Sequence, residues 1–347
     1  MTRRPEPEGH FPGASLAAAI LGILAALGCG GERPGDRVVA YVAHDLIYSE
    51  PILKEFERRT GIRVDIVGDT EASKTTGLAN RLVQLKDRPE ADVFWNNELL
   101  RTAQLADMGL FQPFVPRAAA GIPQACCDAA GRWTGFAARA RVILYNKELV
   151  RAEDAPKSIF DLAEPRCRGK VALANPLFGT TATHAAVLFA HLGPEKAKDF
   201  FLRLKMNGVK VVPGNAMARN LVMDGEVPIC LTDTDDANGA LELGKPVEMV
   251  YPDQEGMGTL VIPNSVALVK GGPHPEAGRK LVEFIVSAEV EEALARSKAA
   301  QMPLRPGVPP HDPRFDFARI KAMEVDWSRA VAAARESAEF VQSVFLK

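Results

Sequence analysis

The 347-residue sequence has no excess of charge of either sign, and this absence narrows its range of partners. Its formal net charge at pH 7 is −2, so the composition gives no argument for binding nucleic acid or an anionic membrane surface. Beyond the first 31 residues, no apolar stretch is long enough to cross a bilayer. With 47% hydrophobic and 25% charged residues, the chain has the composition of a packed globular protein and is long enough for two domains.

Sequence motifs of several enzyme classes are also missing. The sequence has no G-x-S-x-G elbow, Walker A loop, H-E-x-x-H motif or CxxC pair. Ser265 and His274 stand in no recognisable nucleophile–base arrangement. These absences argue against an enzyme. A secreted enzyme acting on a phosphorylated substrate stays open as the alternative to a protein that only binds its ligand.

The N-terminus has the features of an export signal. Two arginines near the start precede the apolar, small-residue run 14–31, as in a secretory signal peptide. Cys29 is the candidate lipid-bearing cysteine of a bacterial lipoprotein, although Ala26 stands where leucine is usual. Cleavage without lipidation and an uncleaved anchor remain open. We expect a signal peptide over 1–29, a tether over 30–36, no covalent group other than the lipid, and a protein outside the cytoplasm that touches the membrane only through this anchor.

The four remaining cysteines do not define a metal or redox site. They are Cys126, Cys127, Cys167 and Cys230. An oxidising compartment permits disulfides, and four cysteines allow three pairings between which the sequence does not choose. Cys230 ends an apolar run and is predicted to be a small buried residue.

Strand and helix patterns alternate along the mature chain. Residues 37–43 are rich in β-branched side chains and predict a buried strand. Ser49 is predicted to cap the helix that follows, which ends at Gly61. The same alternation continues to residue 109 and resumes over 170–233. It predicts an α/β fold whose two lobes each hold a mostly parallel sheet flanked by helices.

The chain leaves the first α/β unit, builds a second and returns, so two crossover strands are expected to form a hinge. We assign 37–138 and 249–347, including the C-terminal helices, to lobe 1, and 139–248 to lobe 2. Ligands of open α/β sheets bind beyond the carboxyl ends of the strands, here in the cleft between the lobes. Tyr48 and His44 follow the first strand, although His44 is equally consistent with a turn residue bonded to backbone.

An acidic cluster follows the last strand of the second unit. It consists of Asp233, Asp235 and Asp236. An EF-hand calcium loop is excluded, because Asn238 occupies the position that needs glycine. Two roles remain open, capping of the next helix and contact with a positively charged ligand group. We expect one aspartate to cap and at least one other to face the cleft.

An anion site is predicted where residues 179–184, with the sequence GTTATH, open a helix. Backbone amides at a helix start and the hydroxyls of Thr180, Thr181 and Thr183 suit a phosphate, phosphonate or carboxylate. Arg139 and Arg141 have the spacing of one strand face. They are candidates either for bidentate contact with the anion or for bridging the lobes.

Segments from Val38 to about Pro306 resemble the extracellular solute-binding proteins of bacterial ABC importers. The resemblance is to the ferric-ion-binding group with the type II periplasmic binding fold. It rests on the order of YVAHDLIYSEPILKEFERRTGIRVDI, EADVFWNNELLRTAQLADMGLFQPF, GRWTGFAARARVILYN and GTLVIPNSVALVKGGPHPEAGRKLVEFIVS. It implies a monomer that closes on its ligand and passes it to a permease and its ATPase.

The resemblance also implies site residues. Ferric members carry an acidic or histidine ligand after the first strand and a glutamate after the ADVF strand, which points to His44 and to Asn97 and Glu98. Their tyrosine pair is replaced by Thr234 and Asp235. Asn215 matches the asparagine that contacts the family's bound anion.

Two ligand classes remain open. One is Fe(III) or another hard cation together with an anion. The other is a zwitterion such as an aminophosphonate, with its anionic end on the 179–184 helix start and its ammonium on the aspartates.

Overall fold

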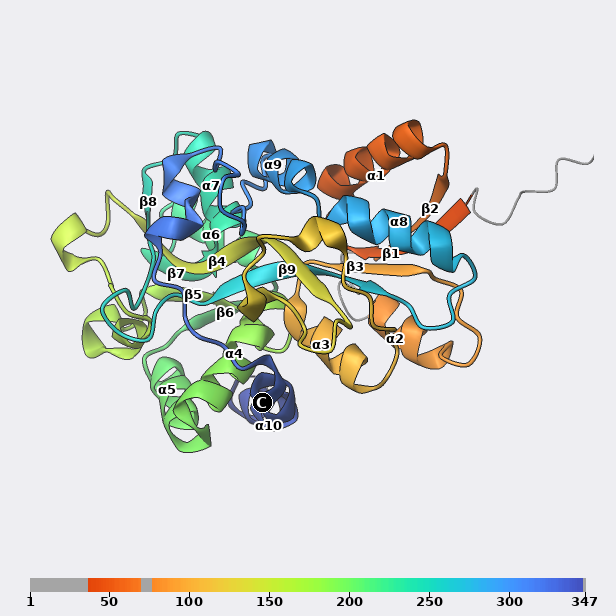
Figure 1. Cartoon of the computed structure of the whole chain (residues 1–347). Helices are drawn as coiled ribbons and strands as arrows, with labels where there is room; N and C mark the ends of the chain where they lie inside the picture. Colours follow the sequence, from red (N-terminus) through yellow and green to blue (C-terminus); the bar gives the residue numbers. More distant parts are fainter. Residues whose placement is uncertain (1–36, 70–76, 346–347) are drawn as a thin grey trace, which may run out of the picture. The chain divides into compact units, whose positions relative to one another are not determined.

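The computed structural model describes residues 37–69 and 77–345, which belong to one compact unit, Pro34–Lys347 (Figure 1). The predicted signal peptide, the tether and Cys29 lie outside the described residues. Among the residues that are described, none of the helices combines the length and apolar character needed to cross a membrane.

The described strands form one hydrogen-bonded network in the order β2-β1-β3-β9-β4-β7-β5-β6, and β8 pairs with β4. Strand β1 is parallel to β2 and β3, and β5 is parallel to β6 and β7, whereas β4, β8 and β9 run antiparallel to their partners. The strands are β1 (Arg37–Ala43), β2 (Arg63–Gly68), β3 (Val93–Asn96), β4 (Thr134–Asn146), β5 (Val171–Ala174), β6 (Lys210–Val212), β7 (Ile229–Asp233), β8 (Val247–Val250) and β9 (Val261–Leu268).

Helices flank this network on both faces. They are α1 (Leu46–Thr60), α2 (Gly77–Gln84), α3 (Leu99–Asp107), α4 (Gly179–Leu192), α5 (Pro194–Met206), α6 (Asn215–Met223), α7 (Thr234–Glu242), α8 (Pro275–Ile285), α9 (Ala288–Arg296) and α10 (Trp327–Phe345). Short 3₁₀ turns fill several of the connections.

Strand β4 joins two half-sheets. Its residues 134–140 pair with β9, and residues 141–146 pair with β7 and β8. We call β1, β2, β3 and β9 the first half-sheet, and β5, β6, β7 and β8 the second. A β-bulge interrupts β4 at Ala137, whose φ of 33° is unusual for a residue with a side chain.

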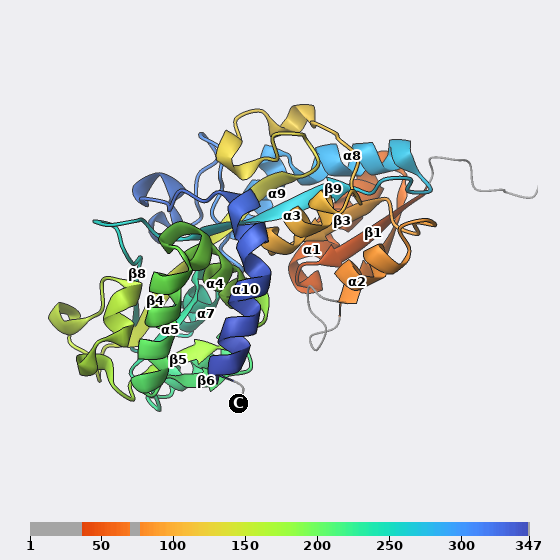
Figure 2. The same ribbon diagram turned by 90° about the horizontal axis from the view of Figure 1, so that it is seen from below.

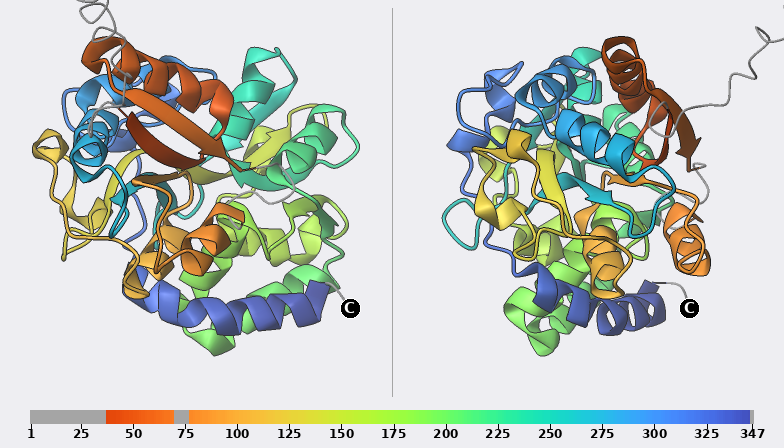
Figure 3. Two further views of the ribbon diagram at one scale, coloured as in Figure 1. Left: turned by 90° about the vertical axis from the view of Figure 1, so that its right-hand side faces the viewer. Right: turned by 45° about the vertical axis from the view of Figure 1, so that its right-hand side comes forward.

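Both faces of the first half-sheet are buried. Val38, Ala40 and Val42 pack under α1, α8 and α9, while Tyr41 and its neighbours on the opposite face pack under α2 and α3. Figure 3 shows the helices on the two sides of these strands. A strand covered on both sides needs a continuous apolar run, and residues 38–43 supply one. The prediction of a buried strand over these residues is confirmed.

The second half-sheet is covered in the same way, by α4 and α5 on one face and by α6 and α7 on the other. Helix α10 packs against α4 and α5 and also against α3, so it contacts helices over both half-sheets (Figure 2). The lobe boundaries remain a prediction, in which α10 was placed with lobe 1.

The predicted start of the first helix needs correction. Helix α1 begins at Leu46, three residues before Ser49, whose hydroxyl donates to the carbonyl of Asp45 at 3.2 Å instead of capping the helix. The end of the helix at Gly61 is confirmed, because Gly61 adopts φ 70° and its N–H donates to Glu57. The cysteines at 126, 127, 167 and 230 are all free thiols, and Cys230 is fully buried as predicted.

Candidate functional site

The predicted site residues gather at the carboxyl ends of the parallel strands. His44 follows β1, Asn97 follows β3, Thr180 opens the helix after β5, Asn215 opens the helix after β6, and Asp233 ends β7. Contacts between side chains link these positions across the two half-sheets. The strand-end rule therefore located a real cluster of polar side chains.

A buried ion pair lies at the centre of the cluster. Arg141 and Asp233 are opposite one another on β4 and β7, and Nη1 of Arg141 lies 2.5 Å from Oδ1 of Asp233. The side chains are 0% and 1% exposed. Such a charge pair is tolerated in the interior only when further hydrogen bonds satisfy both partners.

Those further bonds come from the second half-sheet. Oδ2 of Asp233 accepts from the Thr180 hydroxyl at 2.6 Å and from Nδ2 of Asn215 at 2.9 Å. Nη1 of Arg141 also lies 3.1 Å from the Thr180 hydroxyl, and Nη2 donates to Thr181 at 3.2 Å. Asp233 occupies the N-cap position of α7, yet its carboxylate makes no capping bond. The expectation that one aspartate caps this helix is therefore wrong for Asp233.

One hydrogen-bond donor of the cluster, on Arg141, has no acceptor in the described part of the chain. Nε of Arg141 is buried and has no hydrogen-bond partner among the described residues. The start of α4 is also free of side-chain capping, since Phe178 stands at the N-cap and the Thr180 and Thr181 hydroxyls turn toward Arg141 and Asp233. A buried guanidinium beside an uncapped helix start is a favourable environment for an oxyanion.

Arg139 bridges the two half-sheets. Its Nη1 lies 3.0 Å from Oδ2 of Asp235 on α7 and 3.8 Å from Oδ2 of Asp233. Its Nη2 reaches Asn97 after β3, either at the carbonyl (3.2 Å) or at Oδ1 (2.9 Å), in which case the Asn97 amide donates to Ala43. Bridging was one of the two roles left open for this arginine.

Asp235 and Asp236 sit at the first turn of α7 and are less buried than Asp233. Together with Asp233 they can bring one oxygen each within 4.8 Å of one another. Burial, followed by the charge of Asp235 and then of Asp233, raises the pKa of Asp236 to about 8. The hydroxyl of Thr232 donates to Asp236 at 3.1 Å, and Nη1 of Arg219 lies 3.8 Å away. A pKa in this range favours the protonated form of the Asp236 carboxyl at neutral pH, because burial and the charges of Asp235 and Asp233 disfavour its ionised form.

This raised pKa predicts how stability changes with pH. The folded protein binds more protons than the unfolded chain between the ordinary aspartate pKa of 3.8 and about 8. The free energy of unfolding should therefore fall as the pH rises through this window, by at most ~1.4 kcal/mol per pH unit for one proton. Denaturant unfolding from pH 5 to 9 measures this slope. Asp236→Asn should flatten the slope, and parallel curves for the two proteins would contradict the assignment.

Glu98 is used as a helix cap. Its two carboxylate oxygens accept from the N–H groups of Leu100 and Arg101 at the start of α3, at 2.7 and 2.9 Å. The hydroxyl of Thr183 on α4 also donates to it, which links the two half-sheets a second time. Burial raises the pKa of Glu98. The Glu98 carboxylate does not belong to the group formed by the three aspartates. That Glu98 contacts a bound cation therefore stays a prediction.

His44 and Tyr48 border the cluster from the first half-sheet. The His44 ring is buried and stacks on Trp95 at 5.3 Å, with Nδ1 3.2 Å from the carbonyl of Asp45. Tyr48 is half-buried against His44 at 6.1 Å, and burial and the charge of Asp235 raise its pKa. Both residues therefore lie beside the acidic end of the site.

Sequence reasoning missed Arg219. Asn215 and Arg219 are four residues apart on α6, and residues with this spacing lie on one face of a helix. That spacing was the available signal, because Asn215 was already a candidate.

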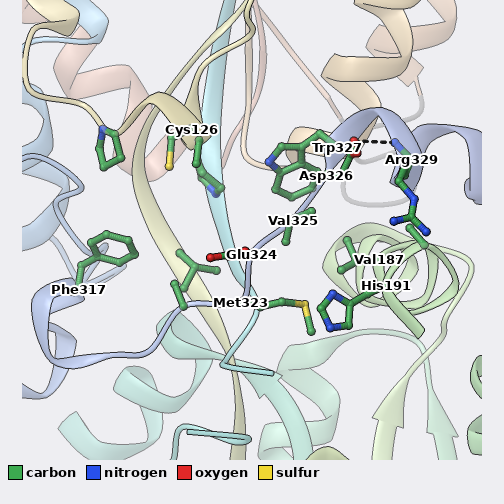
Figure 4. Close-up of a pocket in the computed structure, with 16 residues that line it drawn as sticks. Cys126, Val187, His191, Phe317, Met323, Glu324, Val325, Asp326, Trp327 and Arg329 are labelled. Atoms are coloured by element: carbon green, nitrogen blue, oxygen red, sulfur yellow. Dashed lines mark hydrogen bonds between the residues drawn. The ribbon is translucent and has the colours of Figure 1, made fainter. Parts of the chain in front are cut away.

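Of the cavities lined by the described residues, two bear on the location of the site. One, of about 630 Å³, is lined by Trp327, Met323, His191 and Phe317, with Cys126 at its edge (Figure 4), and by none of the predicted site residues. The other, of about 290 Å³, is lined in part by Glu98, Gly179 and Thr183 and so borders the predicted anion site.

The chain is similar to known proteins over most of its length. Residues 89–321 match the family model described as bacterial extracellular solute-binding protein. The chain belongs to this family. Its members are binding proteins located outside the cytoplasm, as the family description states.

Individual members of the family differ in the ligand for which they are named. Iron uptake protein A1 of a Synechocystis species is 27% identical over 303 residues, which cover 84% of this chain and 82% of the relative. A Salmonella typhimurium periplasmic protein, provisionally named for binding 2-aminoethylphosphonate, is 27% identical over 278 residues, 76% of each chain.

A solved structure confirms the fold. Iron-bound HitA from Pseudomonas aeruginosa superposes with a TM-score of 0.79 at 27% identity, covering 89% of this chain and 99% of that one. The predicted α/β fold of two lobes, of the type II periplasmic binding class, is therefore confirmed. The roles of individual site residues remain predictions.

Proposed function

We propose that this solute-binding protein is the extracytoplasmic component of an ABC importer and delivers a small ligand to a permease and its ATPase. The ligand binds between the two half-sheets and carries a phosphonate, phosphate or carboxylate group. The protein binds without catalysing a reaction. It works as a monomer held at the membrane by lipid on Cys29, with 37–138 and 249–347 forming one lobe and 139–248 the other.

The unused Nε of buried Arg141 is the observation that carries this proposal. The guanidinium is held in place by Asp233, and the hydroxyls of Thr180 and Thr181 lie beside it. Asn215 completes the group from α6. Nε of Arg141 offers a charged donor to an oxyanion, and the uncapped start of α4 adds backbone N–H groups. Thr180 and Asn215 hold Asp233 in place by donating to its carboxylate.

The acidic end of the site favours a ligand that also has a positive charge. Asp236 keeps a proton at neutral pH because burial and its carboxylate neighbours disfavour its charged form. An ammonium group placed there would replace that proton and neutralise the carboxylate. A zwitterion such as an aminophosphonate can bind Arg141 and the start of α4 through its anionic group and Asp236 through its ammonium group.

Fe(III) with a bound anion is the second candidate. The three aspartate oxygens within 4.8 Å of one another and the iron-named relatives favour it. Two features oppose it. Arg139 and Arg141 already neutralise Asp235 and Asp233. Thr234, one of the two residues at the family's tyrosine positions, is fully buried with its hydroxyl accepting from the N–H of Ala140.

Titration calorimetry at pH 7 with 2-aminoethylphosphonate and with ethylphosphonate tests this proposal. We expect saturable, one-to-one binding of 2-aminoethylphosphonate. Ethylphosphonate keeps the anion but lacks the ammonium, and should bind at least ~10-fold more weakly, because it leaves the carboxylate of Asp236 without a cation.

Ferric citrate is titrated in parallel. Heat from ferric citrate together with none from either phosphonate would replace the zwitterion by iron as the ligand. Equal affinity for the two phosphonates would support the anion site and contradict the proposed role of the aspartates in binding the ammonium group.

A further inference from the structure

The guanidinium of Arg139 occupies the acidic end of the site and is itself largely buried. Its side chain is 9% exposed and contacts Asp235 on α7 and Asn97 after β3. It approaches from β4, two residues after the strained bulge at Ala137. The contacts tie this cation to both half-sheets, so it is a fixed part of the site rather than a mobile surface side chain.

The pairing of charges in the site is uneven. Arg141 lies 2.5 Å from Asp233, and Arg139 lies 3.0 Å from Asp235. Among the described residues, the ion pair of Asp236 is with Arg219, at 3.8 Å, and the Arg219 side chain is 23% exposed. Two of the three carboxylates therefore have an arginine within 3.0 Å, and the third has no described cation that close.

The pairing of carboxylates with arginines limits which ligands the site can bind. A ligand with one ammonium group needs one carboxylate as its partner, and Asp236 can supply that carboxylate. A trivalent metal needs several ionised carboxylate oxygens at once and would be repelled by a guanidinium fixed within the same cluster.

We propose that Arg139 is a specificity-determining residue that limits the acidic end of the site to one positive charge and thereby excludes multivalent metal ions. The inference rests on the proposed function of this site. It also gives a reason why this protein would not bind iron although relatives are named for iron binding. Removing this one cation should free the carboxylate of Asp235, beside Asp236, to bind a metal. Asp233 stays paired with Arg141.

The experiment is a calorimetric titration of Arg139→Gln with TbCl₃, a soluble hard trivalent cation. Glutamine keeps hydrogen-bond donors for Asn97 and Asp235 but removes the charge. We expect at least ~100-fold tighter Tb³⁺ binding than for the wild-type protein, which should show no saturable heat below about 1 mM. Arg139→Lys restores a positive charge and should show no saturable Tb³⁺ binding, like the wild type.

Arg335→Met is the matched control, because it removes one positive charge from an exposed pair with Glu339 on α10. It should leave Tb³⁺ binding as in the wild type. Circular dichroism checks that each variant is folded, and Arg139→Met replaces the glutamine variant if the latter is not.

Tight Tb³⁺ binding by the wild-type protein, or no gain in a folded Arg139→Gln or Arg139→Met variant, would overturn the inference. Titration of the wild type with 2-aminoethylphosphonate separates the two proposals. Binding of the phosphonate without a metal gain in the variant rejects only the role of Arg139, whereas a metal gain without phosphonate binding rejects only the proposed ligand.

Discussion

Arg141→Met is expected to lose both stability and ligand affinity. The substitution leaves the carboxylate of Asp233, 1% exposed, without its charge partner. Removing one member of a buried ion pair costs about 3–5 kcal/mol of unfolding free energy. Affinity for 2-aminoethylphosphonate should fall roughly 10- to 100-fold or more, since each hydrogen bond to a charged group contributes about 1.5–3 kcal/mol. Urea unfolding and calorimetry measure the two effects.

A double variant separates the two roles of this arginine. Arg141→Met combined with Asp233→Asn removes both charges, so much of the lost stability should return. Ligand affinity should stay low, because the anion still lacks its guanidinium. Recovery of ligand affinity in the double variant would show that Arg141 contributes to stability but not to ligand binding. An unchanged urea midpoint in the single variant would contradict the buried pair.

Glu291→Ala is the second substitution with a large expected effect. The Glu291 side chain is 0% exposed and accepts from the N–H of Ala137 at 2.8 Å, the N–H of Leu304 at 3.1 Å and Nε of Arg305 at 2.7 Å. Alanine would leave a mostly buried guanidinium and two N–H groups without this acceptor. We expect the free energy of unfolding to fall by about 3–5 kcal/mol, measured by urea denaturation.

The same substitution should also weaken ligand binding, because Glu291 holds the bulge of β4. Ala137 has a positive φ there, and Asn264 donates to its carbonyl at 2.7 Å from the neighbouring strand. The bulge sets the register of the residues that follow, including Arg139 and Arg141.

Glu289→Ala is the control for this position. Glu289 lies two residues earlier and pairs with Arg59 on the surface, where both side chains are more than 40% exposed. Exposed pairs contribute about 0–1 kcal/mol, so the control should change little. Equal losses in the two variants would mean that the buried network at Glu291 is not what stabilises the bulge.

Much of the fold was predictable from local patterns. Residues 38–43 are apolar on both faces, as expected of a buried strand, and Gly61 supplied the left-handed residue that ends α1. The start of α1 was missed, because the serine preference at N-caps competes with the ability of a serine hydroxyl to bond a carbonyl within the helix, as Ser49 does.

The candidate site was predictable as a set of positions but not as a set of contacts. Polar residues after successive strands pointed to Thr180, Asn215 and Asp233. The pairing of Arg141 with Asp233 was not predictable, because the two residues are 92 positions apart and meet only through the register of β4 and β7. Glu98 was predicted to face a cation, and its use as the cap of α3 depends on the geometry of that turn.

The sequence by itself determined the alternation of strands and helices, the strand ends where the polar groups stand, and the absence of the tyrosine pair. These are local properties of neighbouring residues. Only the tertiary structure decided which charges neutralise one another, since ionic pairing depends on distances between segments far apart in the chain. That pairing leaves one donor on Arg141 and one proton on Asp236, and the ligand we propose follows from both.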